Sequence, residues 1–145
     1  MQMHKSIYFI IGFLFTINGC STFQLNDKGL KERVVGCWYG ESFQPVFENV
    51  SAWLIRRDTN GNFSIEFRSV DSSGEVGIQS ESGTWEIKSG IYSTVTTGVA
   101  GQKVSPPYID VYTIQSLSAK KLTLIHDETK LKFESKRVGC DYHMP

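Results

Sequence analysis

The sequence predicts an all-β protein, an antiparallel up-and-down β-barrel of about eight strands that follows a leader and a short linker. Two observations predict this fold. After residue 33, apolar and polar residues alternate with a period of two, as they do in a sheet with one buried face. Turn residues separate these stretches at intervals of roughly ten residues, which is typical of an antiparallel meander.

Residues 1–19 have the composition of a secretory signal peptide. Met1 to Lys5 form a small charged segment, and Ile7 to Ile17 form an apolar run that is too short to span a bilayer as a helix. Gly19 supplies the small residue that a signal peptidase needs before its cleavage site. We therefore expect this leader to be removed.

The segment 17–20, Ile-Asn-Gly-Cys, resembles the lipobox of bacterial lipoproteins. The resemblance implies cleavage before Cys20 and acylation of this cysteine, palmitate included, so that a lipid anchor holds the chain on a membrane. Ser21 is not acidic, which in such lipoproteins implies the outer membrane, with the domain facing the periplasm. The alternative is an ordinary cleaved signal peptide that leaves Cys20 as a thiol.

The mature part of the chain divides into a tether and one domain. Residues 20–33 are polar and predict the lipidated tether, which ends either in a loop or in one helical turn, and residues 34–145 predict the β-barrel domain. We expect strands at about 34–42, 50–57, 62–70, 76–80, 83–88, 91–97, 109–116 and 121–126, with 130–138 as a ninth candidate. The alternation of Phe63, Ile65 and Phe67 with polar residues is the clearest pattern. The stretch 76–80 is the weakest, and its alternative is a loop.

The connections between these strands carry turn residues. Asn60-Gly61 suits a two-residue hairpin because both residues tolerate a positive φ. Further turns are expected at 72–74, 89–90 and 127–129. The connection 98–107 contains two glycines and the pair Pro106-Pro107, so we expect a long loop there. Such a loop is either a binding element or a plain crossover.

Charge and cysteine content narrow the class of protein. With 15 basic and 15 acidic residues, the chain has no electrostatic footprint for nucleic acid. Cys37 and Cys140 form an even pair in an exported domain, which favours a disulfide over a metal site or a reactive thiol. In an up-and-down barrel the first and last strands are neighbours, so this bridge would close the barrel. A β-sandwich is the alternative.

The segment 36–38, Gly-Cys-Trp, at the start of the first expected strand resembles the Gly-x-Trp motif of lipocalins and lipocalin-like barrels. The resemblance covers residues 34–140. It implies that Trp38 packs across one end of the barrel and that Arg137, near the last strand, stacks over its ring. It also implies a barrel that binds a small apolar or amphipathic ligand.

Candidate binding residues lie on the central strands. Trp53, Arg56, Arg57, Tyr92 and Tyr108 are candidates to line a barrel mouth, although aromatic residues at alternating strand positions also serve as core. We expect no catalytic residue, no metal site and no cofactor. The only titrating cluster, at 126–128 (His-Asp-Glu), lies in an expected turn and indicates a solvated turn rather than acid–base chemistry.

Three classes of function follow. The first is a membrane-anchored, non-catalytic binding module for a small apolar or amphipathic ligand. The second is an envelope factor that binds another protein through its barrel loops, as lysozyme inhibitors or accessory subunits do. The third, an enzyme, is the least favoured, because the sequence contains no nucleophile elbow, phosphate-binding loop or dinucleotide motif.

Overall fold

The computed structural model describes residues 26–44 and 49–145. The leader, the expected lipidation site Cys20 and the first part of the tether therefore lie outside the described residues. The described chain forms α1 (Asp27–Val34), β1 (Gly36–Gln44), β2 (Asn49–Arg57), β3 (Asn62–Val70), β4 (Val76–Lys88), β5 (Ile91–Val99), β6 (Gln102–Leu117), β7 (Lys121–His126) and β8 (Lys132–Val138).

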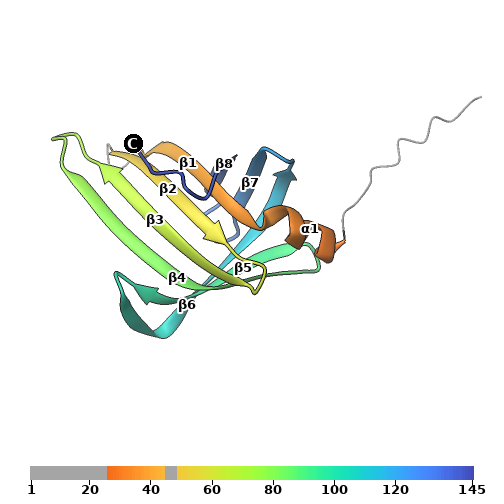
Figure 1. The fold of residues 1–145 in the computed structure, drawn as a ribbon. Coiled ribbons are helices and arrows are strands. Elements are labelled where there is room, and N and C mark those ends of the chain that lie inside the picture. Colours follow the sequence, from red (N-terminus) through yellow and green to blue (C-terminus); the bar gives the residue numbers. More distant parts are fainter. Residues whose placement is uncertain (1–25, 45–48) are drawn as a thin grey trace, which may run out of the picture.

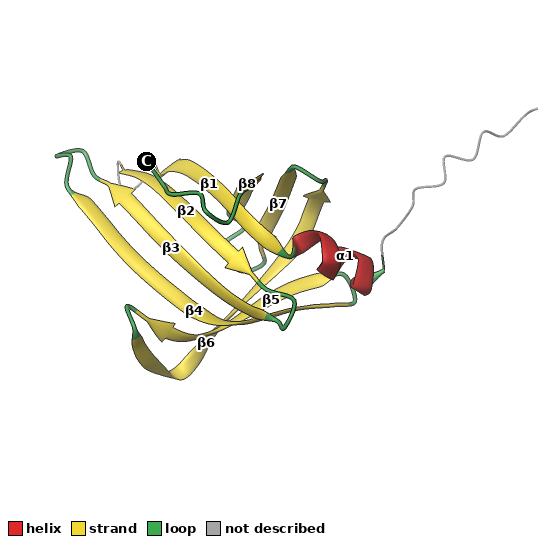
Figure 2. Cartoon of the chain, in the orientation of Figure 1, coloured by secondary structure: helices red, strands yellow, loops and turns green. Residues whose placement is uncertain are grey.

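These strands form a closed barrel in sequence order, β1 to β8, and the up-and-down fold predicted from the sequence is confirmed (Figure 1). Each strand pairs antiparallel with the next, and β8 pairs with β1 from Cys37↔Val138 to Gly40↔Ser135. Figure 2 shows α1 at one end of the barrel and the tips of β3 and β4 projecting at the other. The barrel is compatible with the lipocalin-like architecture that the Gly-x-Trp motif implies.

The strand count differs from the sequence prediction at β4. The expected strands 76–80 and 83–88 form one strand, with a shift of register toward β5 between Ser82 and Gly83. A Cβ on Gly83 would overlap the carbonyl oxygen of Val95, so the neighbouring strand approaches closely only because this residue is glycine. The candidate at 130–138 is β8, and the barrel therefore has eight strands.

The prediction of a long loop at 98–107 is wrong. β5 and β6 form a hairpin whose turn is Ala100-Gly101, with φ angles of 49° and 76°. Pro106 and Pro107 lie within β6, in the interval where its register toward β5 shifts between Thr96 and Gly98. Because β7 pairs only with residues 112–117 of β6, the missing N–H groups of the prolines interrupt no ladder.

The tether expected over 20–33 is helical from Asp27 onward. The side chain of Asn26 caps α1 by accepting a hydrogen bond of 2.9 Å from the N–H of Gly29. The Asp27 carboxylate accepts two more, at 2.7 and 2.8 Å, from the N–H groups of Ser89 and Gly90 in the β4–β5 turn. These bonds hold α1 across one end of the barrel, where Val34 is fully buried.

Trp38 closes this end of the barrel, as the lipocalin resemblance implies. The ring is fully buried, and its Nε1–H donates to the carbonyl of Val34 at 2.9 Å. The guanidinium of Arg137 lies over the ring, 4.2 Å from its centroid. Gly36 is required beside it, because a Cβ would lie 2.6 Å from Arg137 Nη1 and the backbone φ is 118°.

The predicted disulfide joins Cys37 of β1 to Cys140, with Cα atoms 5.2 Å apart. It fixes the C-terminal tail against the outer face of β1 and β2. There the ring of Tyr142 packs on Tyr39 at 5.2 Å, and both lie in a cluster with Leu54. The bridge and this outer cluster therefore stabilise the strand pair that closes the barrel.

Candidate ligand-binding cavity

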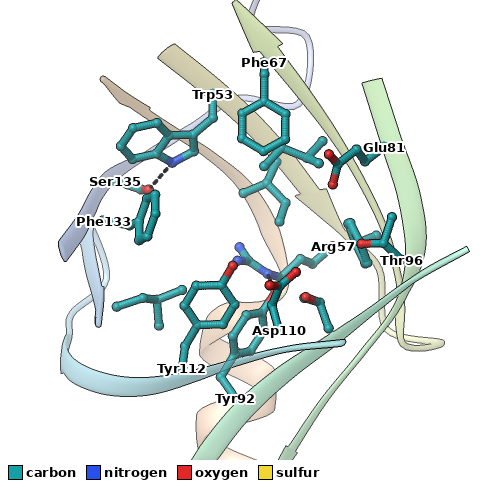
Figure 3. Close-up of a pocket in the computed structure, with 15 residues that line it drawn as sticks. Trp53, Arg57, Phe67, Glu81, Tyr92, Thr96, Asp110, Tyr112, Phe133 and Ser135 are labelled. Atoms are coloured by element: carbon teal, nitrogen blue, oxygen red, sulfur yellow. Dashed lines mark hydrogen bonds between the residues drawn. The ribbon is translucent and has the colours of Figure 1, made fainter. Parts of the chain in front are cut away.

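The barrel interior holds a cavity of about 80 Å³ that is partly open toward solvent (Figure 3). Its lining combines aromatic and aliphatic side chains with a few charged and hydroxyl groups from seven strands, β2 to β8. The lining residues are Trp53, Ile55, Arg57, Phe63, Ile65, Phe67, Glu81, Tyr92, Thr94, Thr96, Asp110, Tyr112, Leu124, Phe133 and Ser135. Typical small-molecule pockets have roughly 300–1,000 Å³, so this space admits only a compact group.

The two-residue period of the strands selects the lining. On β3, Phe63, Ile65 and Phe67 line the cavity, while the residues between them face outward. On β5, Tyr92, Thr94 and Thr96 do the same and are each buried. The alternation that predicted the strands thus also builds the cavity walls.

Trp53 forms one wall of the cavity. Its Nε1–H donates to the hydroxyl of Ser135 at 2.9 Å, and its ring packs edge-on against Phe133 at 5.5 Å. Gly40 of β1 lies behind this ring, and a Cβ at that position would overlap it. The ring is therefore fixed in orientation by a hydrogen bond on one side and by a glycine on the other.

Arg57 is the buried cation of the cavity. The residue is 5% exposed, and its Nε–H donates to the hydroxyl of Tyr92 at 2.7 Å. The guanidinium carbon lies 4.8 Å from the centroid of the same ring. Its Nη1 has no hydrogen-bond partner among the described residues. A buried guanidinium with an unused donor is costly, since its desolvation is only partly offset.

Two tyrosines lie against this cation. The rings of Tyr92 and Tyr112 are 5.6 Å apart. Burial raises the pKa of both phenols. The charge of Arg57 lowers both pKa values in part, and the Asp110 carboxylate raises the pKa of Tyr112 further. Both phenols are therefore neutral at physiological pH and can donate or accept hydrogen bonds.

Two carboxylates also line the cavity. Asp110 Oδ1 lies 3.3 Å from His126 Nε2. His126 Nδ1 accepts the N–H of Thr129 at 3.1 Å, which places the proton of the neutral ring on Nε2, toward Asp110. Glu81 accepts a hydrogen bond of 2.7 Å from the side chain of Gln79. His126 thus contacts a residue on β6 rather than Asp127 or Glu128, its neighbours in sequence.

The structure separates the residues that the sequence grouped as binding candidates. Trp53 and Tyr92 line the cavity. Arg56 points out of the barrel, where it donates to the carbonyl of Tyr142 at 3.5 Å, and Tyr108 is 56% exposed on β6 and is not part of the lining. Arg57, the other member of the arginine pair, is the one inside, because adjacent strand residues face opposite sides.

Sequence reasoning did not identify Glu81 and Asp110 as lining residues. The alternation along β6 could have identified Asp110. It lies two residues from Tyr112, and residues that face the barrel interior recur at that spacing along a strand. Glu81 is likewise in phase with Trp85 and Ile87, the buried residues of β4, because the register shift places its extra residue on β5 and leaves the alternation of β4 intact.

Comparison with known proteins adds no assignment: no protein-family model matches the chain, and no curated protein matches it. Within the described ranges, no helix is long and apolar enough to cross a membrane. The same residues contain no group of three or more His, Cys, Asp or Glu side chains that could hold a metal ion.

Proposed function

We propose that this protein is a lipid-anchored protein of a bacterial cell envelope whose barrel binds a small amphipathic molecule without catalysing a reaction. The observation that carries the proposal is the cavity. It is partly open, has aromatic walls, and contains a buried cation with an unused donor. Convergent polar groups in an otherwise apolar cavity are the usual composition of a ligand site.

The sequence supports the envelope location. The leader 1–19 and the Ile-Asn-Gly-Cys ending favour acylation of Cys20 and attachment to the outer membrane. The Cys37–Cys140 bridge is consistent with an oxidising compartment. Intact mass of the protein from a bacterial host tests the anchor. A mass increase that is lost in Cys20→Ala supports it, and an unmodified Cys20 contradicts it.

Native mass spectrometry tests the binding function. We expect protein purified from its own envelope to retain a small molecule. Thr94→Leu adds volume inside the barrel and should abolish retention, whereas Thr97→Leu makes the same change at an exposed position of β5 and should not. Retention by the Thr94→Leu protein, or none by the wild type, opposes the proposal.

The second candidate, a protein-binding envelope factor, has one observation in its favour. Tyr108 and Ile109 on the long strand β6 are 56% and 69% exposed. A specific envelope protein that binds to the wild type, and does not bind to the double variant Tyr108→Ser with Ile109→Ser, would favour this function.

An assay for catalysis tests the claim that the protein is not an enzyme. Hydrolysis of an ester or a glycoside by the wild type, abolished in His126→Ala, would contradict that claim.

A further inference from the structure

The cavity contains a buried hydrogen-bond donor that requires an acceptor, Arg57 Nη1, which has no partner among the described residues. Trp85 Nε1 is also buried without such a partner, but Trp85 is not part of the cavity lining. Both residues contact Tyr92: Arg57 through the 2.7 Å hydrogen bond, and Trp85 through ring packing at 6.1 Å. Buried donors are normally satisfied, and one attached to a cation is satisfied best by an anionic oxygen.

The same cavity also contains negative charge, which excludes a simple anion as the best ligand. Asp110 and Glu81 belong to the lining. Asp110 uses Oδ1 for His126, and its Oδ2 accepts no hydrogen bond from a described residue. The Asp110 side chain is 40% exposed, whereas Arg57 is 5% exposed, so the cation is deep and the carboxylate is nearer to solvent.

A positive and a negative side chain therefore line the same small cavity. Both are close enough to change the pKa of Tyr112, which the Asp110 carboxylate raises and the Arg57 guanidinium lowers. Neither carboxylate forms an ion pair with Arg57 within the described chain. A ligand with only a negative group would be repelled by the carboxylates, and one with only a positive group would be repelled by Arg57.

We propose that the cavity binds a small zwitterion, an α-amino acid with an apolar side chain. Its carboxylate accepts hydrogen bonds from Arg57, and its ammonium group faces Asp110. This inference rests on the proposed function and names its ligand class. The amino-acid head group has few heavy atoms, which suits a cavity of about 80 Å³. The apolar side chain then extends along Ile65 and Phe67, which are part of the same lining.

Three probes that differ by one charged group test the proposal on the full-length protein in a nonionic detergent. L-leucine, 4-methylpentanoate (leucine without its ammonium group) and 3-methylbutylamine (leucine without its carboxylate) are titrated by calorimetry. We expect leucine to bind, and each single-charge probe to bind about tenfold or more weakly, as expected when one charged hydrogen bond is lost. Equal affinity of the acid or the amine overturns the proposal. So does the absence of binding by leucine, valine, methionine and phenylalanine alike.

Variants locate the site. Arg57→Met should weaken leucine binding about tenfold or more, whereas Arg56→Met, on the same strand but outside the barrel, should leave it unchanged. Asp110→Asn should weaken leucine binding but not binding of the acid. If Asp110→Asn affects both equally, or Arg56→Met acts like Arg57→Met, the assignment is wrong. The wild-type probe series decides the question even if a variant does not fold.

Failure of this inference is distinguishable from failure of the proposed function. If the protein from its own envelope retains a molecule that is not a zwitterion, the ligand class is wrong and the binding function stands. If no molecule is retained and none of the probes shifts the indole N–H resonance of Trp53 in an NMR spectrum, both fail. Trp53 is the reporter because it is the one tryptophan in the cavity lining of the described chain.

Discussion

Two arginines of the barrel each contact an aromatic ring, but only Arg137 has a hydrogen-bond partner for each of its three side-chain nitrogens. At the end closed by α1, Arg137 stacks on Trp38 and donates to the carbonyls of Ala119, Val35 and Arg33. In the cavity, Arg57 donates to Tyr92 alone, and its Nη1 has no partner among the described residues.

The difference separates a structural role from a binding role. Arg137 is half-buried, and its hydrogen bonds join the end of α1, the connection from α1 to β1 and the β6–β7 turn, so they form on folding. Arg57 is more deeply buried and gains less from the protein itself. A cation retained in such a place contributes little to stability, and we expect its contribution to appear in binding.

The largest expected change in unfolding free energy comes from removing the Cys37–Cys140 disulfide. Replacing Cys37 and Cys140 together by serine removes a cross-link that spans 103 residues. The chain-entropy model gives a loss of about 4.7 kcal/mol for a loop of this size. Urea unfolding of both proteins measures it. A loss below about 1 kcal/mol would mean that the unfolded chain is already constrained.

Trp38→Ala should cost about 3–5 kcal/mol, because the ring is fully buried and its removal leaves a cavity beneath Arg137. The same urea titration measures this loss. Trp53→Ala serves as the comparison from the other region. Its ring borders existing open space, so we expect a smaller loss there. Equal losses would erase the distinction between the two regions.

Arg137→Met should lower the unfolding free energy by about 2–3 kcal/mol, since it removes the stacking contact and leaves three carbonyls without their donor. Leucine affinity should not change, because Arg137 is not part of the cavity lining. A change in affinity without a change in stability would reverse the roles assigned to the two arginines.

A smaller effect is expected at alkaline pH. Burial raises the pKa of Tyr92 and Tyr112, and burial with the nearby Glu41 raises that of Tyr39 to about 12. These phenols therefore keep their protons in the folded state above pH 10, where an unfolded chain loses them. Stability is unaffected below about pH 10 and falls as the pH rises toward the folded values.

Unfolding midpoints in urea at about pH 8 and pH 11 measure this fall. Tyr112→Phe should reduce it, whereas Tyr108→Phe, which changes an exposed side chain, is the matched control. A midpoint that rises between the two pH values would contradict the assigned direction.

Local patterns were sufficient for most of the fold. The alternation on β3 predicted a strand, and Cys37 and Cys140 predicted which strands meet, because a disulfide is a long-range constraint visible in the sequence. The segment 98–107 was misassigned because Gly and Pro are local turn signals. Its pairing with β5 depends on a register that no local pattern determines.

The cavity was only partly predictable for the same reason. Trp53 and Tyr92 were identified by residue type, but Arg56 and Arg57 are chemically identical in the sequence. Only the register of β2 shows which of them points inward, and a shift by one residue would exchange them. Glu81 was missed because it falls between the expected strands 76–80 and 83–88, which are one strand, β4, in the structure.

The most direct test compares the unfolding free energies of Arg57→Met and Arg137→Met in the absence of added ligand. Methionine has nearly the volume of the arginine stem and does not need a hydrogen-bond acceptor. We predict that Arg57→Met is as stable as the wild type, or more stable, while Arg137→Met loses about 2–3 kcal/mol. If Arg57→Met loses as much as Arg137→Met, Arg57 is a structural residue and the case for a built ligand site in the barrel is contradicted.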